Sequence, residues 1–500
     1  MASSGVGYTD ALFAYPPSMY LDANDQGFQR SLVHCDIAIV GAGPAGITLA
    51  SAFKNTKMQV CILESGGFDA ASFPQELSTG KVHSPSPALD KDYISQHSQR
   101  LFGGTGSVWG GYCRPLDAID FEQRDLPCTH RWPFPLAELD PYYPWGALEN
   151  KQDQQQVPAS RLLIKHYERV IYPFNSVHRN EFLSDQNISV ILHATVRDII
   201  LHDPQSVAHL NVVNTGSATE TSHKSFQVKA KVYILACGGI GNVKLLLNSD
   251  GVAKKGIGNQ RDQVGRHFME HPHFQFFTPP ALLWLGDKKA GWLYRSERYK
   301  PAFYLQQDLV RDEKLLNFCA MVSAPFEPQS QLAGSKLYRP RFASLSDREG
   351  AYYSLAFRCE QSPHADSRVI LSPEKDALGM RRVQLDWKLQ EIDRWSLFRS
   401  IDLLIEELGR ASLGRVKLIL DRQQPWTTMV GGGHLMGTTA MGHASEDSVT
   451  DPHGRIHSMD NLYVAGSSLF PTSGVSNPTL TLMALARRLA AHLQDKLRGG

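Results

Sequence analysis

The sequence of 500 residues is 42% hydrophobic and 20% charged, with a formal net charge of +1. This length suits roughly two or three globular domains, and the near-neutral charge gives no electrostatic reason to expect binding to nucleic acid or to an anionic membrane surface. No apolar run predicts a transmembrane segment, and the polar, proline-interrupted segment 1–30 lacks the pattern of a signal peptide.

The first strong pattern is a glycine-rich turn between a strand and a helix. Residues 37–40 are β-branched or small apolar residues, which is typical of a parallel strand buried on both faces. Gly41, Gly43 and Gly46 then form G-x-G-x-x-G, in which the first glycine makes the turn, the second lets backbone approach a pyrophosphate, and the third lets the helix pack on the strand. The N–H groups at the start of that helix would face the phosphates.

A second apolar strand at 59–63 ends at Glu64. An acidic residue about 20 residues past the glycines is placed to accept hydrogen bonds from an adenosine ribose. The order of strand, glycines, helix, strand and acidic residue predicts a dinucleotide-binding βαβ unit over 31–68. The alternative is an ordinary βαβ turn whose glycines serve packing only.

The middle of the chain mixes loops, strands and a second small-residue turn. Residues 69–100 lack periodicity and predict an extended surface loop, and the glycines of 103–111 indicate close backbone contact with a cofactor or another segment. Alternation at 188–200 predicts a strand with hairpin partners at 207–213 and 225–228. A buried strand then ends in glycines at 231–239 and is followed by a helix at 242–248, an arrangement that binds ligands in open α/β sheets.

The last part of the chain changes character twice. Residues 275–420 are aromatic-rich and often alternate, with one long helix near 392–408, and predict a largely antiparallel module. A third strand then ends in small residues at 461–467, and Pro478 suits the first turn of a helix running to about residue 492. The nucleotide-binding turn lies near the start of the sequence, and the strand and small-residue turn at 461–467 that would complete its site lie near the end. The binding domain is therefore expected to be discontinuous.

The expected organisation is an α/β protein with a doubly wound, Rossmann-like binding domain and an antiparallel-sheet substrate domain. The segments are an N-terminal extension (1–30), binding-domain parts (31–150, 186–274 and 426–500), a linker or substrate-side segment (151–185) and the substrate domain (275–425). Seven scattered cysteines without C-x-x-C spacing, some in core strands, favour reduced thiols and a cytoplasmic location.

The ordered motifs resemble those of the glucose–methanol–choline (GMC) oxidoreductases, FAD-dependent enzymes that oxidise alcohols. The matching segments are 41–46 with Glu64, 103–107 with 109–111, 236–239 with Asn242, 434–442, 449–451, 464–467 and 477–479. Within the family, the chain is most similar to the branch of pyranose oxidases, fructose-dehydrogenase-type subunits and antibiotic sugar oxidases.

The resemblance implies an FAD site. Its ADP half would be held by Gly41, Gly43, Gly46 and Glu64, with the backbone of Val196 facing the adenine. The pyrophosphate, ribityl chain and flavin would be lined by Gly104, Gly106, Ser107, Gly466 and Ser467, and the cofactor-binding set is completed by Ala236, Pro478 and Thr479. Some members attach the flavin through a histidine. The comparable position here is Val108, so we expect non-covalent FAD.

The resemblance also implies the catalytic pair His434 and Asn477. In such enzymes a base takes the hydroxyl proton while hydride leaves the carbon for flavin N5. A histidine suits that role because its pKa lies near neutral. Asn477 would donate to the substrate oxygen, helped by the dipole of the following helix. The alternatives are a turn histidine satisfied by backbone and a plain N-cap asparagine, and the latter is compatible with catalysis.

A cluster of His267, Glu270, His271 and His273 invites a metal interpretation, but it lacks the H-E-x-x-H order and contains Pro272. The resemblance places this turn at the edge of the flavin domain, with no metal.

The expected function is oxidation of a CH–OH group of a sugar, glycoside or other polyol or alcohol, with oxygen, a quinone or a redox protein as electron acceptor. The alternatives are a flavin-containing lyase of the same fold and a catalytically silent flavin-binding subunit.

Overall fold

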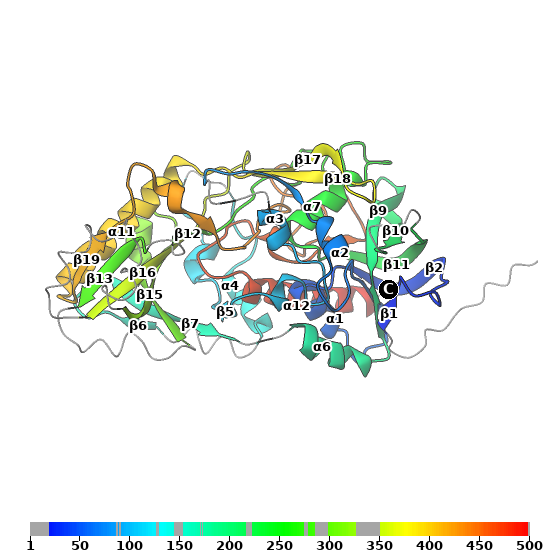
Figure 1. The fold of residues 1–500 in the computed structure, drawn as a ribbon, viewed down its shortest axis with the longest axis horizontal. Coiled ribbons are helices and arrows are strands. Elements are labelled where there is room, and N and C mark those ends of the chain that lie inside the picture. The colour runs from blue at the N-terminus through cyan, green and yellow to red at the C-terminus, as the bar shows by residue number, and fades with distance from the viewer. Residues whose placement is uncertain are drawn as a thin grey trace, which may run out of the picture.

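The computed structural model shows an elongated molecule with a sheet in each half (Figure 1). It describes residues 20–86, 89, 92–126, 130–144, 154–170, 172, 174–216, 223–274, 279–285, 299–326 and 351–498. Within these residues, no helix combines the length and the apolar character that crossing a bilayer would need.

The first sheet contains the predicted nucleotide-binding strands. Its order is β1-β8-β3-β2-β11-β10-β9, with β21 paired to β11. The pairs from β1 to β11 and the β11–β21 pair are parallel. In contrast, β10 pairs antiparallel with both β9 and β11, as the predicted hairpins require. The strands are β1 (Tyr20–Asp22), β2 (Leu32–Val40), β3 (Val60–Leu63), β8 (Ile188–Leu192), β9 (Ala194–Asp203), β10 (Ser206–Asn214), β11 (Ser225–Leu235) and β21 (Leu462–Val464).

This sheet is covered on both faces, as the apolar run in β2 predicts. Alternate residues of β2 belong to different core clusters: Ile37 and Ile39 to one, Ala38 and Val40 to the other. The first cluster includes residues of α1 (Pro44–Ser51), α6 (Phe174–Leu183) and α12 (Thr479–Arg498), and the second includes residues of α7 (Gly238–Asn248). Helices therefore flank the sheet on both sides, which confirms the doubly wound architecture.

The second sheet is antiparallel and lies in the other half of the molecule (Figure 1). Its order is β19-β13-β16-β15-β14-β7-β5, with β12, β20 and β6 attached, and α11 (Glu391–Arg410) contacts it. The strands are β5 (Tyr112–Cys113), β6 (Gln154–Gln156), β7 (Leu162–Arg169), β12 (Pro272–Phe274), β13 (Ala281–Leu285), β14 (Tyr299–Leu305), β15 (Phe318–Phe326), β16 (Ala351–Cys359), β19 (Arg415–Leu418) and β20 (Val430–Gly431).

A third, small sheet joins distant parts of the chain. β17 (Arg368–Lys375) pairs with β18 (Arg381–Asp386), and β18 pairs in parallel with β4 (Gly80–His83). The prediction of an extended loop over 69–100 was therefore wrong in part, because this segment also contains α2 (Ser72–Glu76) and α3 (Tyr93–Gln96). Elements of four or five residues are too short to show a period, and β4 depends on a partner strand far along the chain.

The strand predicted over 188–200 is two strands. His193 has φ of 51° and separates β8, which pairs in parallel with β3, from β9, which pairs antiparallel with β10. A left-handed residue of this kind turns the chain, and a non-glycine residue gives no sequence signal for it. The remaining elements are α4 (Leu136–Leu139), α8 (Gln307–Asp312) and 3₁₀ turns at Gly104–Ser107, Ala118–Phe121, Asp140–Tyr142, Pro425–Thr428 and Ser467–Leu469.

Candidate active site

A cavity of about 620 Å³ lies where strand ends of the first sheet face residues of the second sheet. Thirteen of the predicted site residues line it: Gly41, Gly43, Glu64, Gly104, Gly106, Val196, Ala236, His434, Gly466, Ser467, Asn477, Pro478 and Thr479. Gly46 and Ser107 are not among the lining residues; Gly46 packs against the turn, and the Ser107 hydroxyl is buried without a hydrogen bond.

The glycine turn leaves space at one position. Gly41 has φ of 104°, and a Cβ on it would lie 2.7 Å from the Ala236 carbonyl oxygen, while one on Gly46 would lie 2.0 Å from the Gly41 carbonyl oxygen. A Cβ on Gly43 would meet no heavy atom within 4 Å. Gly43, Pro44 and Ala45 all line the cavity, so the N-terminus of α1 borders open space, as a pyrophosphate site requires.

Glu64 is held by this turn. One carboxylate oxygen accepts a 2.8 Å hydrogen bond from the Ala42 amide, and the other accepts a 2.9 Å bond from the Gly66 amide. Burial raises the pKa of the Glu64 carboxyl. A carboxylate has about four lone-pair sites, so both oxygens can still accept from ribose hydroxyls.

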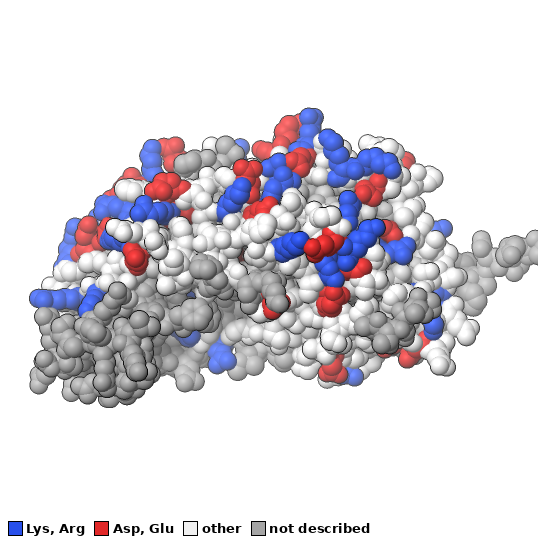
Figure 2. All heavy atoms as spheres, turned by 45° about the horizontal axis from the view of Figure 1, so that its top comes forward, with Lys and Arg blue, Asp and Glu red and all other residues white. Residues whose placement is uncertain are grey.

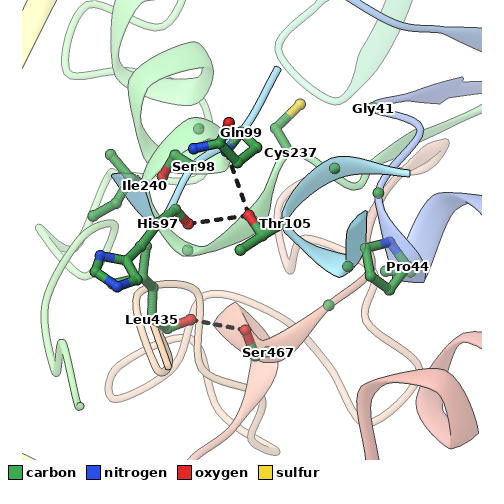
Figure 3. A pocket seen from close by; sticks show the side chains of 18 of the residues that line it. Gly41, Pro44, His97, Ser98, Gln99, Thr105, Cys237, Ile240, Leu435 and Ser467 are labelled. Atoms are coloured by element: carbon green, nitrogen blue, oxygen red, sulfur yellow. Dashed lines mark hydrogen bonds between the residues drawn. The ribbon is translucent and has the colours of Figure 1, made fainter. Parts of the chain in front are cut away.

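The second glycine-rich turn, Gly104–Ser107, lines the middle of the cavity (Figure 3). A Cβ on Gly104 would lie 2.9 Å from the Gly43 Cα, so the two glycine turns are in close contact. Thr105 Oγ1 donates to the His97 carbonyl at 3.2 Å, and Ser467 Oγ donates to the Leu435 carbonyl at 2.8 Å (Figure 3). The first bond holds Gly104–Ser107 against the preceding segment, and the second joins the two C-terminal segments that contain His434 and Gly466.

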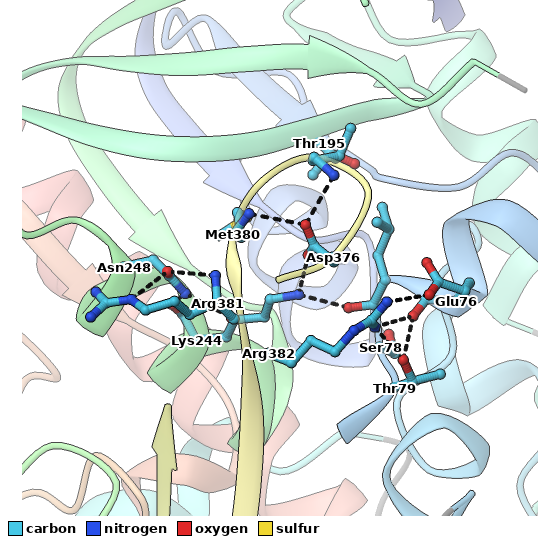
Figure 4. A network of polar contacts seen from close by, with 12 residues as sticks. Glu76, Ser78, Thr79, Thr195, Lys244, Asn248, Asp376, Met380, Arg381 and Arg382 are labelled. Carbon is cyan, nitrogen blue, oxygen red and sulfur yellow. Dashed lines mark hydrogen bonds and ion pairs between the residues drawn. The ribbon is translucent and has the colours of Figure 1, made fainter. Parts of the chain in front are cut away.

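The small sheet borders the end of the cavity at which the adenosine of FAD is expected. Lys244 donates to Asp376 at 2.6 Å and to the Leu77 carbonyl at 2.8 Å, and both charged side chains line the cavity (Figure 4). Burial lowers the pKa of Lys244 to about 8. The β17–β18 connection, which the sequence assigns to the substrate module, thus contributes Asp376 and Met380 to this end.

At the opposite end of the cavity, Glu270 holds the backbone of the candidate catalytic segment at His434. Its carboxylate accepts 2.9 Å bonds from the His434 amide, a 2.7 Å bond from the His271 amide, and a hydrogen bond from the Tyr93 hydroxyl. It is fully buried, and burial raises the pKa of its carboxyl. One side chain therefore determines the backbone position of two histidines.

His434 and His271 form a directed pair. Their Nδ1 atoms lie 2.8 Å apart, and His271 Nε2 lies 3.3 Å from the Ser473 carbonyl oxygen. A carbonyl only accepts, so His271 Nε2 carries a proton, and in a neutral ring its Nδ1 then accepts from His434 Nδ1. The free lone pair of His434 is consequently on Nε2, and the residue lines the cavity.

The surroundings of His434, His271 and His273 favour the neutral form of each imidazole ring. Burial lowers the pKa of His434 well below its usual value, with smaller contributions from His271 and Arg358. Burial also lowers the pKa of His271 to about 4, and that of His273 well below 6.5. A neutral His434 at pH 7 is able to accept a proton.

Asn477 is oriented by a cation. Its Oδ1 accepts a 2.7 Å hydrogen bond from Nη1 of Arg358, which lies on β16. A guanidinium has no acceptor, so the amide oxygen must face Arg358 and the amide NH₂ is left to donate. Asn477 immediately precedes Pro478 and the start of α12.

The Glu270–His273 turn therefore lies beside His434, where the second sheet borders the cavity. The turn includes β12, which pairs with both β16 and β20 and so enters the second sheet. Nitrogen atoms of His271, His273 and His434 lie within 4.8 Å of one another and could hold a transition metal ion. His267 lies apart from them, against the ring of His130.

Comparisons with known proteins show which family the chain belongs to. A family model for an FAD binding domain matches residues 36–316, more than half of the chain, and one for GMC oxidoreductases matches residues 363–486. The fructose dehydrogenase large subunit of Gluconobacter japonicus is 28% identical over 58% of this chain, a match that spans only 52% of that protein. The 6'''-hydroxyparomomycin C oxidase of Streptomyces lividus is 25% identical over 92% of each chain.

Among solved structures, pyridoxine 4-oxidase from Mesorbium loti shares the fold, with a TM-score of 0.59, 16% identity and coverage of 92% of this chain and 99% of that chain. The open space at Gly43, the helix N-terminus and the pre-oriented Glu64 fit FAD. The chain therefore belongs to the GMC family of FAD-dependent oxidoreductases.

Proposed function

We propose that this protein oxidises a CH–OH group of a sugar, glycoside or related polyol to a carbonyl. The observation that carries the proposal is the directed pair His271–His434, with its 2.8 Å Nδ1–Nδ1 contact, which leaves the Nε2 lone pair of a neutral His434 available in the cavity. The names of two similar proteins, the fructose dehydrogenase large subunit and the 6'''-hydroxyparomomycin C oxidase, support a sugar or glycoside substrate.

In the proposed reaction, His434 takes the hydroxyl proton onto Nε2. The amide NH₂ of Asn477 donates a hydrogen bond to the same oxygen as negative charge develops there, and Arg358 keeps this amide in the donating orientation. FAD, when bound, supplies the acceptor for the two electrons that leave the alcohol carbon with its hydrogen. Glu270 holds the His434 backbone so that the base and the donor face one site.

We propose further that the FAD is not covalently attached. Val108, at the position where some members carry a histidine, lines the cavity, is 63% exposed and has no nucleophilic atom. Acid precipitation should leave the flavin in the supernatant. Flavin that remains with the precipitated protein would contradict this assignment.

The test of function is an anaerobic titration of the holoenzyme with sugars, glycosides and simple alcohols. Loss of the oxidised flavin absorbance with one class of alcohol would support the proposal and identify the substrate class. Flavin that no alcohol bleaches would contradict it and favour a lyase or a silent subunit. Readmission of air would then separate oxygen from a quinone or redox protein as acceptor, because only oxygen restores the absorbance directly.

A further inference from the structure

The substrate end of the cavity contains two cations on one face of the second sheet. Arg358 lies on β16 opposite Cys319, which lies opposite Tyr304 on β14. Lys300 is four residues before Tyr304 on the same strand, so Lys300 and Arg358 share a face. Both line the cavity that contains His434 and Asn477.

Tyrosine rings lie between these two cations. Lys300 is opposite Tyr167 in the β14–β7 pair, and the Arg358 guanidinium lies 5.4 Å from the centre of the Tyr167 ring. The Lys300 ammonium lies 4.3 Å from the centre of the Tyr112 ring. Such contacts hold a cation in place without neutralising its charge.

Arg358 is buried without a carboxylate partner among the described residues. It is 7% exposed, its Nη1 donates to the neutral amide of Asn477, and its Nε makes no hydrogen bond. The nearby Glu360 is engaged elsewhere: it receives two hydrogen bonds from Arg124 and one from the Asn317 amide. A buried guanidinium without a carboxylate partner is costly unless an anion from outside completes the site.

Lys300 also has no carboxylate partner in the described part of the chain. The described acidic residues that line the cavity are Glu64 and Asp376. Glu64 is bound to the glycine turn and Asp376 to Lys244, both at the adenosine end. The outer surface differs, because Lys and Arg alternate with Asp and Glu over the face in Figure 2.

The cofactor phosphates do not account for these cations. The expected pyrophosphate site is at α1 in the first half of the molecule, whereas β14 and β16 lie in the other half (Figure 1). Arg358 is instead next to the candidate catalytic groups, since it pairs across strands with His273 and bonds to Asn477.

We infer that the substrate is an alcohol that also carries a carboxylate, such as a sugar acid or another hydroxy acid, bound by Arg358 and Lys300. This inference rests on the proposed alcohol oxidation and narrows its substrate class. The guanidinium offers a planar set of N–H donors that matches a carboxylate, and Lys300 adds a point charge. The tyrosine rings would pack against the carbon skeleton.

A binding experiment tests the inference independently of turnover. Benzoate and its neutral isostere benzamide are titrated into the holoenzyme, and binding is followed by the change in the flavin spectrum. We expect benzoate to bind at least tenfold more tightly than benzamide. Lys300→Met and Arg358→Met should each reduce this preference, whereas Lys255→Met, at an exposed lysine outside the cavity, should retain it.

A kinetic experiment compares kcat/KM for a carboxylate-bearing alcohol with that for its neutral partner, such as D-glucuronate with D-glucose or glycerate with glycerol. Lys300→Met should lower kcat/KM for the acid of a reactive pair at least tenfold more than for the neutral partner, mainly through KM. Equal binding of benzoate and benzamide, or an unchanged preference in both variants, would overturn the inference. An Arg358→Met variant that changes only the flavin reduction potential would also overturn it.

The two proposals fail in different ways. If no alcohol bleaches the flavin but benzoate is still preferred through Lys300, the alcohol-oxidation proposal is wrong and the anion site stands. If neutral sugars bleach the flavin as efficiently as their acids and benzoate is not preferred, the oxidation proposal stands and the anion site is wrong.

Discussion

The Nδ1 atoms of His271 and His434 lie 2.8 Å apart, and the other nitrogen of His271 faces the Ser473 carbonyl. This chain of bonds fixes which nitrogen of each neutral ring carries the proton. His271 does not need to touch the substrate to affect catalysis, because it determines the tautomer of the residue that does.

Replacing His271 separates this positioning role from simple packing. His271→Leu leaves the Nδ1–H of His434 without an acceptor, at a cost of about 1–3 kcal/mol, and should lower the rate of flavin reduction about 10- to 100-fold. His271→Gln should recover much of that rate, because the side-chain oxygen can accept the same proton. Stopped-flow reduction measures both; equal rates in the two variants would exclude the tautomer role.

The pH dependence follows from the lowered pKa of His434. A ring whose pKa lies well below 6.5 is unprotonated at pH 7 and takes up a proton only as the pH falls further. The rate of flavin reduction should therefore be constant above pH 6.5 and decline on the acid side. Anaerobic reduction rates between about pH 4.5 and 8 measure this. An acid limb with a midpoint above 6.5 would contradict a His434 that is neutral at pH 7.

The His434→Ala variant tests the base itself. It should retain bound FAD, since the predicted cofactor turns lie elsewhere in the cavity, and lose about 10²–10⁴-fold in turnover. His443→Ala, at an exposed histidine nearby in the sequence, is the matched control and should behave as the unmodified protein. Unchanged turnover in His434→Ala would remove this residue from the mechanism.

The nucleotide-binding half could be predicted from sequence because its signals are local. The apolar run before Gly41, the glycine spacing and Glu64 all lie within one βαβ unit, and the fold follows from them. Arg358 carries no such signal: it is one arginine in an alternating strand, 119 residues from the amide that it orients. His271 and His434 are separated by 163 residues, and they come together through long-range contacts such as the pairing of β12 with β20 and the bridge between Met269 and Met436.

Glu270 is the structural support of the catalytic end, and Glu270→Gln tests it. The carboxylate accepts from two backbone amides and from Tyr93, whereas glutamine would place an NH₂ donor against one of these donors. We expect a loss of about 1–3 kcal/mol in stability together with reduced turnover. Tyr93→Phe, which removes one bond and adds no donor, should have a smaller effect on the melting temperature. The reverse order would show that Glu270 does not hold this segment.

The glycine turn allows cofactor binding to be separated from folding. A Cβ on Gly43 meets no protein atom within 4 Å, and its backbone has φ of −79°, so Gly43→Ala should fold normally. The added methyl enters the cavity at the N-terminus of α1, where the pyrophosphate must approach the backbone, and FAD affinity should fall at least about tenfold.

Two other glycines serve as controls. Gly27→Ala also meets open space but lies outside the cavity, and Gly46→Ala would clash with the Gly41 carbonyl. Flavin content and circular dichroism of the three purified variants therefore distinguish the cases. Loss of FAD with a native spectrum is expected for Gly43→Ala alone. Full FAD content in that variant would show that the pyrophosphate does not lie over this turn.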